Sequence, residues 1–327
     1  MKHAPARRRR MFGLFAAALL LAGCGGVQST LLPAGIEAQK IANLFLFMAA
    51  GAIVIWLLVV ALAIHATVIN PGRHSIRTAR RLIVGAGVVF PVIVLAGLLV
   101  YGLALMPQLR APVANDGLRI AVSGEQWWWR VRYLLPDGEE VTLANEIRLP
   151  VGERVEFRLS SPDVIHSFWI PSLAGKVDMT PGRTTTLALT PTRTGFYRGA
   201  CAEYCGASHA HMNFAVVVME PDAFDEWLRQ QARPAQKPAS ALAARGRDAF
   251  LFNGCGACHT VRGTAASGTV GPDLTHVGSR IGIAAGTLAT SPADFRNWID
   301  HPKAIKPDVH MPAFGMLPDD DLRAIAA

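Results

Sequence analysis

Cys201-Ala202-Glu203-Tyr204-Cys205-Gly206-Ala207-Ser208-His209-Ala210-His211-Met212 concentrates metal-binding side chains in one short stretch of this 327-residue chain. Another histidine, His166, lies upstream in the stretch Asp163-Val164-Ile165-His166-Ser167-Phe168-Trp169. Two thiolates, two imidazoles and a thioether form a soft ligand set, and soft mixtures of this kind select copper over harder ions. Because the two cysteines share one loop, both can bridge a pair of ions. The stretch therefore predicts a binuclear copper site.

Three other kinds of site use the same residue types. Cys201 and Cys205 could form a disulfide in an oxidising compartment. A Cys2His2 set could bind structural zinc. One cysteine could serve a mononuclear blue-copper site, with the second cysteine incidental. The stretch by itself leaves these alternatives open.

The sequence around these ligands alternates between apolar and polar residues with the period of a β-strand. Turn signals separate the alternating runs, as in Pro136-Asp137-Gly138 and Pro181-Gly182. This rhythm predicts an all-β sandwich or barrel over residues 110–220. The alternating apolar residues are Leu118, Ile120 and Val122, then Val155, Phe157 and Leu159, then Leu187 and Leu189.

A second redox motif follows in Asn253-Gly254-Cys255-Gly256-Ala257-Cys258-His259. C-x-x-C-H is the attachment signature of c-type haem, in which Cys255 and Cys258 form thioethers and His259 becomes the proximal iron ligand. A thioredoxin-like pair or half of a zinc site is the alternative, and the added histidine and the single C-x-x-C disfavour both. The stretch His310-Met311-Pro312-Ala313-Phe314 resembles the axial-methionine loop of small class I cytochromes c, which implies Met311 as the sixth ligand, with Met316 and His310 as rivals.

An amphipathic helix from Pro221 to Ala232 and a Pro-rich run up to Ala239 separate the two motifs. Two prolines among small and polar residues are typical of a linker. We therefore expect a linker over residues 221–239 and a separate haem-bearing domain over residues 240–327.

The N-terminus has the composition of an export signal. A basic start and an apolar run from Met11 lead to Leu21-Ala22-Gly23-Cys24. This pattern predicts a secretory signal over residues 1–23 that resembles those of bacterial lipoproteins, with Cys24 as the lipid-bearing residue. The alternative is an uncleaved anchor with an incidental cysteine.

Two apolar runs, Ile41 to Ile64 and Leu82 to Met106, are each long enough to cross ~30 Å of hydrocarbon. They predict membrane helices over 41–66 and 82–106, the alternative being a buried soluble hairpin. The loop 67–81 between them has four arginines and no acid, so we expect it to be cytoplasmic. Residues 24–40 and everything after Met106 then lie outside the cytoplasm, at a bacterial inner membrane.

The net charge of +8 gives little support for a nucleic-acid partner. Five positive charges, at Lys2 and Arg7–Arg10, lie in the expected signal, and without them the net charge is +3. Basic patches that bind nucleic acid are denser than this. We expect no nucleic-acid partner.

The stretch from Gly117 to Met219 resembles the CuA domain of haem–copper oxidase subunit II, because the pattern C-x-E-x-C-x3-H-x2-M is present in full. The resemblance implies that Cys201 and Cys205 bridge the coppers. It also implies that the Glu203 side chain faces a magnesium ion at the boundary with subunit I, and that His211 is not a ligand. The remaining implied copper ligands are His166, His209, Met212 and the backbone carbonyl of Glu203.

The run Gly124-Glu125-Gln126-Trp127-Trp128-Trp129 also resembles that family, although Glu125 stands where the family has histidine. Trp127 corresponds to the surface tryptophan through which electrons enter, and plain packing is the alternative. The family places residues equivalent to Lys176, Asp178 and Arg183 against subunit I. Val84 stands where many members carry a glutamate near a proton channel, so the resemblance does not extend to that route of proton uptake.

Residues 25–327 resemble subunit II of caa3-type oxidases. The implied fold is a transmembrane helical hairpin, a cupredoxin-like all-β CuA domain and an all-α class I cytochrome c domain. The family usually continues the last helix, so we expect a native C-terminus beyond Ala327.

The implied function is electron transfer from a cytochrome c or another periplasmic donor through haem c and CuA to subunit I. That subunit holds the oxygen-reducing site of a proton-translocating cytochrome c oxidase, and other oxidase subunits are further expected partners. The alternatives are a quinol oxidase subunit without copper, an electron-accepting subunit of a nitric oxide reductase, and a free-standing membrane-anchored carrier.

Overall fold

A computed structural model describes residues 25–72, 75–109, 111–114 and 117–327. The expected signal over residues 1–23 and the expected lipidation site Cys24 lie outside these residues. Lys40–Pro112 form one compact unit, and the residues before and after it form a second.

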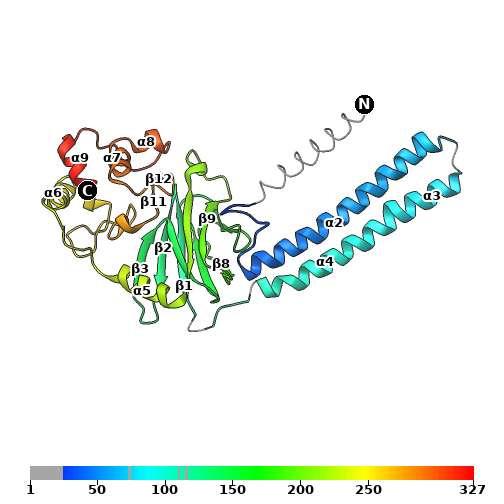
Figure 1. The fold of residues 1–327 in the computed structure, drawn as a ribbon, viewed down its shortest axis with the longest axis horizontal. Coiled ribbons are helices and arrows are strands. Elements are labelled where there is room, and N and C mark those ends of the chain that lie inside the picture. Colours follow the sequence, from blue (N-terminus) through cyan, green and yellow to red (C-terminus); the bar gives the residue numbers. More distant parts are fainter. Residues whose placement is uncertain (1–24, 73–74, 110, 115–116) are drawn as a thin grey trace, which may run out of the picture. The chain divides into compact units, whose positions relative to one another are not determined.

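The first unit is a helical hairpin with two arms (Figure 1). Both arms, Ile36–Ile69 and Ile76–Leu109, are long and apolar enough to cross a membrane. Leu44 and Phe47 of one arm share a small cavity with Ile93 and Leu98 of the other. The helical segments are α2 (Ile36–Ile64), the π-turn η2 (His65–Ile69), α3 (Ile76–Val84), the π-turn η3 (Gly85–Val89) and α4 (Phe90–Leu109).

Large apolar side chains point outward from both arms. Phe45, Trp56 and Leu95 are 53%, 63% and 64% exposed. An apolar surface of this extent is typical of a membrane segment. The hairpin therefore has the surface that a pair of membrane helices requires.

The connection between the arms is shorter than the expected loop 67–81. The second arm already begins at Ile76, because the Ser75 side chain caps it by accepting a hydrogen bond from the Thr78 amide. The basic residues up to Arg81 therefore lie in the first helical turns. Pro91 follows the π-turn Gly85–Val89, where the widened helix accommodates a residue that cannot donate a backbone hydrogen bond.

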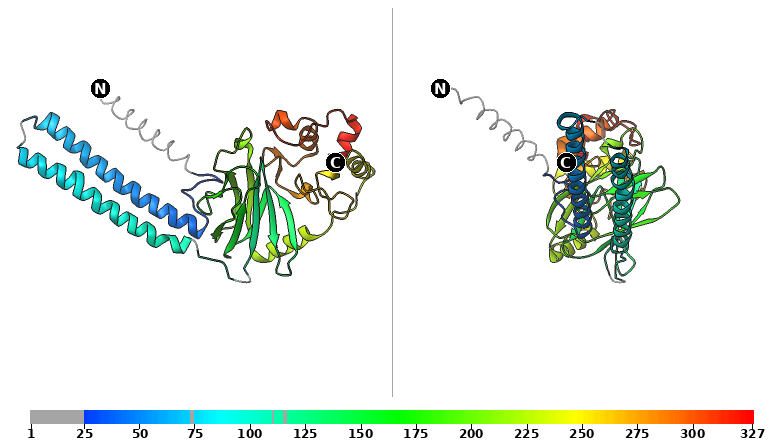
Figure 2. Two further views of the ribbon diagram at one scale, coloured as in Figure 1. Left: turned by 180° about the vertical axis from the view of Figure 1, so that it is seen from behind. Right: turned by 90° about the vertical axis from the view of Figure 1, so that its right-hand side faces the viewer.

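The residues after Val113 begin with a sandwich of two five-stranded sheets (Figure 2). One sheet has the order β3-β2-β1-β5-β8 and the other β4-β10-β9-β6-β7. The pairs β1·β5 and β4·β10 are parallel and the rest are antiparallel. The strands are β1 (Arg119–Glu125), β2 (Trp128–Leu134), β3 (Glu140–Ala144), β4 (Glu146–Pro150), β5 (Val155–Ser160), β6 (His166–Trp169), β7 (Val177–Met179), β8 (Thr185–Leu189), β9 (Gly195–Cys201) and β10 (Asn213–Met219).

Alternation along the strands builds the core of this sandwich. Every second residue of β1, β2 and β10 is buried, as a period of two requires. Four aromatic rings meet between the sheets: Phe168 stacks on Phe214 at 4.9 Å between centroids, and Trp129 and Phe157 pack around them. The all-β domain predicted from the sequence is confirmed.

Helix α5 (Pro221–Ala232) leads from the sandwich toward the C-terminal domain. Phe224 and Trp227 pack against Tyr133 of the sandwich, with ring centroids at 6.1 and 5.5 Å. The following linker is fastened at two points. The Ala235 amide donates to the Arg262 carbonyl at 2.9 Å, and His276 Nε2 donates to the Arg233 carbonyl at 2.9 Å.

The C-terminal domain is mainly helical, as predicted, with one short added β-hairpin. Ser240 and Ser291 cap α6 and α7 by accepting backbone hydrogen bonds from Ala243 and Asp294. The elements are α6 (Ala241–Phe252), the 3-10 turns η5 (Cys255–Ala257) and η6 (Val277–Ser279), β11 (Gly282–Ile283), β12 (Leu288–Ala289), α7 (Pro292–Asp300), α8 (Pro302–Ile305) and α9 (Asp319–Ile325).

The first and last helices of this domain, α6 and α9, cross at Gly246. A Cβ atom at Gly246 would lie 1.9 Å from the Ala324 carbonyl oxygen, which is a backbone atom of α9. We expect Gly246→Ala to destabilise the domain by about 1–3 kcal/mol, because the helices must separate to admit the methyl group. Thermal unfolding of the full chain, followed by circular dichroism, measures this effect.

The control is Gly278→Ala, since a Cβ there meets no neighbouring atom within 4 Å. It should change stability by less than about 0.5 kcal/mol. Equal stabilities for both variants would contradict the close approach of α6 and α9.

Candidate metal centre and haem pocket

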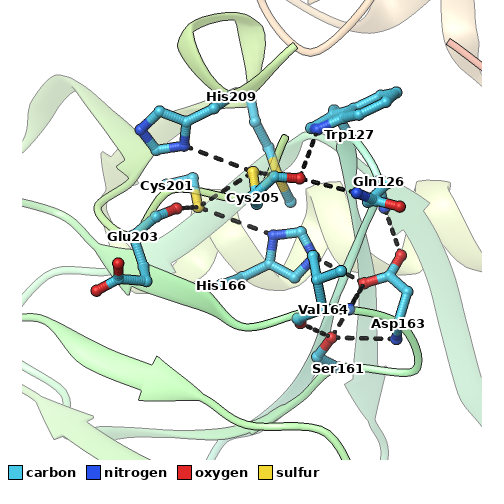
Figure 3. Close-up of polar contacts among 11 residues, drawn as sticks. Gln126, Trp127, Ser161, Asp163, Val164, His166, Cys201, Glu203, Cys205 and His209 are labelled. Atoms are coloured by element: carbon cyan, nitrogen blue, oxygen red, sulfur yellow. Dashed lines mark hydrogen bonds and ion pairs between the residues drawn. The ribbon is translucent and has the colours of Figure 1, made fainter. Parts of the chain in front are cut away.

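Six potential donor groups gather at one end of the sandwich, and Figure 3 shows five of the residues that supply them, His166, Cys201, Glu203, Cys205 and His209. Strand β6 begins with His166 and β9 ends with Cys201, while the loop and 3-10 turn after β9 supply the others. Figure 3 shows the two sulfur atoms facing each other, with both histidine rings turned toward them. The donor atoms are Cys201 Sγ, Cys205 Sγ, His166 Nδ1, His209 Nδ1, Met212 Sδ and the Glu203 carbonyl oxygen.

Each cysteine sulfur lies close to one imidazole nitrogen and to one weaker donor atom. Cys201 Sγ lies 3.8 Å from His166 Nδ1 and 3.1 Å from the Glu203 carbonyl oxygen. Cys205 Sγ lies 3.5 Å from His209 Nδ1 and 3.7 Å from Met212 Sδ. Two equivalent half-sites that share a pair of sulfurs suit two soft ions better than one.

The distance between the sulfurs excludes one alternative reading. The Sγ atoms lie 3.9 Å apart, about twice the length of a disulfide bond, so the two thiols are not linked. A tetrahedral zinc site would use four donors and a blue-copper site one thiolate. Six converging groups with both thiols among them favour a binuclear copper site.

The pair of thiols carries one charge readily. Hydrogen bonding from Cys205 and from His166 lowers the pKa of Cys201, and the same coupling together with burial raises the pKa of Cys205. Although burial opposes it, hydrogen bonding to Cys201 and Asp163 raises the pKa of His166. The cluster therefore favours one thiolate, at Cys201, over two.

Asp163 orients the His166 ring. Its Oδ1 accepts a hydrogen bond from His166 Nε2 at 2.8 Å, which leaves Nδ1 directed at Cys201. The backbone amides of Val164 and Gln126 also donate to this carboxylate, at 2.6 and 2.7 Å. Burial opposes ionisation, but these hydrogen bonds together lower the pKa of Asp163. Its contribution to stability is therefore present above pH 3.8 and is lost as the pH falls through the lower, folded-state value.

A second cavity, of about 870 Å³, lies between the C-terminal domain and the sandwich. Cys255, Cys258, His259 and Met311 line it, as do several residues of the sandwich. His310 also lines it, whereas Met316 is 77% exposed and lies away from it. The residues that the sandwich contributes are Gln126, Trp127, Trp128 and Asn145.

The His259 ring is held in one tautomer. Its Nδ1 donates to the Pro272 carbonyl at 2.8 Å, so the hydrogen lies on Nδ1 and Nε2 has a free lone pair. Burial lowers the pKa of His259 and keeps the ring neutral. A Cβ on Gly271 would lie 2.5 Å from the ring, so only glycine permits this packing. Arg280 also lines the cavity.

Residues 134–219 match the family described as cytochrome C oxidase subunit II, periplasmic domain, and residues 243–327 match the cytochrome c family. The chain therefore contains a copper-domain module of the cytochrome c oxidase subunit II family and a cytochrome c domain. These matches imply copper in the sandwich and haem in the helical domain. His166, Cys201 and Cys205 form a buried group whose ligand atoms all lie within 4.8 Å of one another, which suits that copper.

Relatives named cytochrome c oxidase subunit 2 cover most of the chain. The identity is 37% with that of Alkalihalophilus pseudofirmus, over 66% of this chain and 61% of the relative. The identity with the subunit 2 of Bacillus subtilis is 32%, over 65% of this chain and 61% of that relative. The chain thus spans about three fifths of the length of these relatives. A solved periplasmic domain of subunit II from Bradyrhizobium japonicum is 30% identical over 37% of this chain and 96% of that one, with a TM-score of 0.34.

Trp127 differs from its sequence-based expectation in this chain. A surface position was predicted, but Trp127 is only 5% exposed. The chain's own cytochrome c domain covers it, with the His310 ring at 5.8 Å between centroids. Its Nε1 donates to the Cys205 carbonyl at 2.9 Å, and Gln126 Nε2 donates to the same oxygen at 2.8 Å. A fused domain therefore occupies the face that was expected to be open.

Two residues near the six donor groups were missed from the sequence. Asp163 stands three positions before His166, a spacing that could have drawn attention to it. Lys306 carries no motif, yet its Nζ donates to the Trp127 carbonyl at 2.7 Å. Burial lowers the pKa of Lys306 to about 7.

Removing the charge of Asp163 should weaken copper binding. We expect Asp163→Asn to lower the apparent copper affinity of the full chain by about 10–100-fold, because the carboxylate no longer orients His166. Competition titration with a copper chelator measures the affinity. Asp137→Asn is the matched control in an exposed turn, and an unchanged affinity in Asp163→Asn would contradict the orienting role.

Proposed function

We propose that this chain is the electron-accepting subunit of a respiratory cytochrome c oxidase. It receives electrons at a haem c and passes them through a binuclear CuA centre to subunit I, where oxygen is reduced to water. One observation carries the proposal. The Trp127 side chain lines the haem cavity and donates a hydrogen bond to the backbone of Cys205, so one residue touches both sites.

Four residues would hold the haem. Cys255 and Cys258 would form the thioethers, and His259 and Met311 would bind the iron. All four line one cavity, and His259 already has the tautomer that binds iron through Nε2. A methionine ligand raises the reduction potential of a haem, which suits a carrier that feeds a terminal oxidase.

The copper pair would be held by the six groups described above. A binuclear centre with bridging thiolates shares one electron between two ions, so transfer requires little rearrangement. Cys201 and Cys205 would bridge, and His166, His209, Met212 and the Glu203 carbonyl would complete the set. His166, Cys201 and Cys205 are buried, so protein groups surround the centre of the set.

Donors would dock on the cytochrome c domain and not on the copper domain. Because Trp127 is buried beneath that domain, a separate donor protein does not reach it. Trp127 instead connects the two centres of one chain. Tethering the cytochrome replaces a diffusional encounter with a high effective concentration.

The opposite side of the loop formed by residues 203–212, the copper loop, would face subunit I. Lys176 Nζ lies 3.4 Å from Asp178 Oδ1 and 4.0 Å from Glu203 Oε2. These exposed charges form a rim from which Glu203 could turn to a magnesium ion in the assembled oxidase. The helical hairpin would hold the chain in a bacterial inner membrane, with a lipid on Cys24 and both redox domains on the periplasmic side.

The full chain, expressed with haem attachment and loaded with copper, tests the proposal. Electron paramagnetic resonance should give a seven-line copper hyperfine pattern, as one spin shared by two copper nuclei does, together with a c-type haem band in the optical spectrum. Cys205→Ser should abolish the shared-spin pattern and leave the haem band unchanged, because it removes one bridge. A haem band without the shared-spin signal in the natural chain would contradict the CuA proposal.

The assignment of the sixth haem ligand has its own test. We expect Met311→His to lower the reduction potential of the haem, because it removes the thioether that raises it. Redox titration of the haem band measures this. Met316→Leu is the control, since Met316 is exposed and away from the cavity. If Met316→Leu lowered the reduction potential of the haem and Met311→His did not, Met316 would be the sixth ligand in place of Met311.

A further inference from the structure

A lysine of the cytochrome c domain is buried against the copper domain. Lys306 follows helix α8 directly and is only 2% exposed. Its Nζ donates to the Trp127 backbone carbonyl at 2.7 Å. Lysine is almost never fully buried without a partner, because its ammonium group is costly to remove from water. A specific contact between the two domains therefore accounts for its position.

The residues after Lys306 also contact the copper domain. The Ser208 hydroxyl, in the loop between Cys205 and His209, is fully buried and donates to the Pro307 carbonyl at 2.5 Å. The His310 ring lies against the Trp127 ring. The segment Lys306–His310 thus touches the copper domain at three points immediately before Met311.

Two further hydrogen bonds fasten other parts of the same interface. Glu146 of the sandwich is 5% exposed and accepts from the Ile281 amide at 2.8 Å. Arg130 donates to the Thr269 carbonyl at 2.8 Å. Buried polar groups that are fully paired favour a single arrangement of the surfaces that carry them. The interface is therefore built as one between permanently associated domains.

We propose that Lys306 is a positioning residue that locks the cytochrome c domain onto the copper loop, so that the Met311 segment, Trp127 and Cys205 form one continuous connection between the haem and copper sites. The inference rests on the proposed function for its electron-transfer part. The connection has two hydrogen bonds, from Lys306 to the Trp127 carbonyl and from the Trp127 indole to the Cys205 carbonyl.

The loss of Lys306 would weaken the contact between the two domains and slow electron transfer between the haem and copper sites. Without its amine, the Trp127 carbonyl lacks a donor inside a buried interface, which weakens the closed arrangement. The cytochrome c domain would remain tethered through residues 233–239 and would spend more time away from the copper loop. Electron transfer slows steeply when such a connection opens.

Lys306→Met in the full chain with haem and copper tests the inference, because methionine retains an unbranched apolar side chain of similar reach and removes the donor. Hydrogen–deuterium exchange of residues 203–212 and 306–311 should rise about 10-fold. The rate of electron transfer from photoreduced haem to copper should fall about 10-fold, with the haem and copper spectra unchanged. Lys303→Met, at an exposed lysine of α8 three positions earlier, is the matched control and should behave as the natural chain does.

Ser208→Ala provides a milder second variant, which should shift both readouts in the same direction by a smaller factor. The inference would be overturned if Lys306→Met exchanged hydrogen and transferred electrons at the same rates as the natural chain. It would also be overturned if Lys303→Met changed both rates as much as Lys306→Met does. The exchange readout does not depend on copper. A natural chain without the shared-spin signal would therefore contradict the proposed function, while faster exchange in Lys306→Met would still support the lock.

Discussion

The antiparallel pairing of β6 with β9 is the constraint on which the metal centre depends. Phe168 pairs with Cys201 and Trp169 with Ala200, so His166 at the start of β6 lies beside the sulfur at the end of β9. A slip of one residue would turn His166 to the opposite face of the sheet. The aromatic packing of Phe168 between the sheets holds this register, and thus the core of the sandwich also positions the ligands.

The second constraint is that the cytochrome c domain covers one side of the copper loop. The cytochrome c domain covers Trp127, and it places the cavity lined by His259 and Met311 next to the residue that hydrogen-bonds Cys205. Burying polar backbone at this interface requires partners, and Lys306, Ser208 and Glu146 supply them. The two fused domains are therefore packed against each other and are not joined by a flexible tether alone.

Much of this organisation could be predicted because its signals are local. The spacing of Cys201, Cys205, His209 and Met212 on one loop specifies a soft metal site wherever that loop lies. C-x-x-C-H likewise carries its covalent chemistry within five residues. Apolar runs of membrane length and strict alternation in strands follow from hydrophobic burial, which acts on the sequence pattern itself. Helix ends were predicted less well, because the Ser75 cap extends α3 into the expected loop.

The sequence by itself determined the types of element, the donor residues and the order of the domains, since each depends on neighbours along the chain. Only the tertiary structure decided that Asp163 orients His166, that the thiols stay unlinked and that Trp127 is buried. It also decided that Lys306 lies against Trp127, across 179 residues of sequence. Contacts at such separations depend on how whole surfaces pack together, and the pattern of residues near either partner does not record that packing.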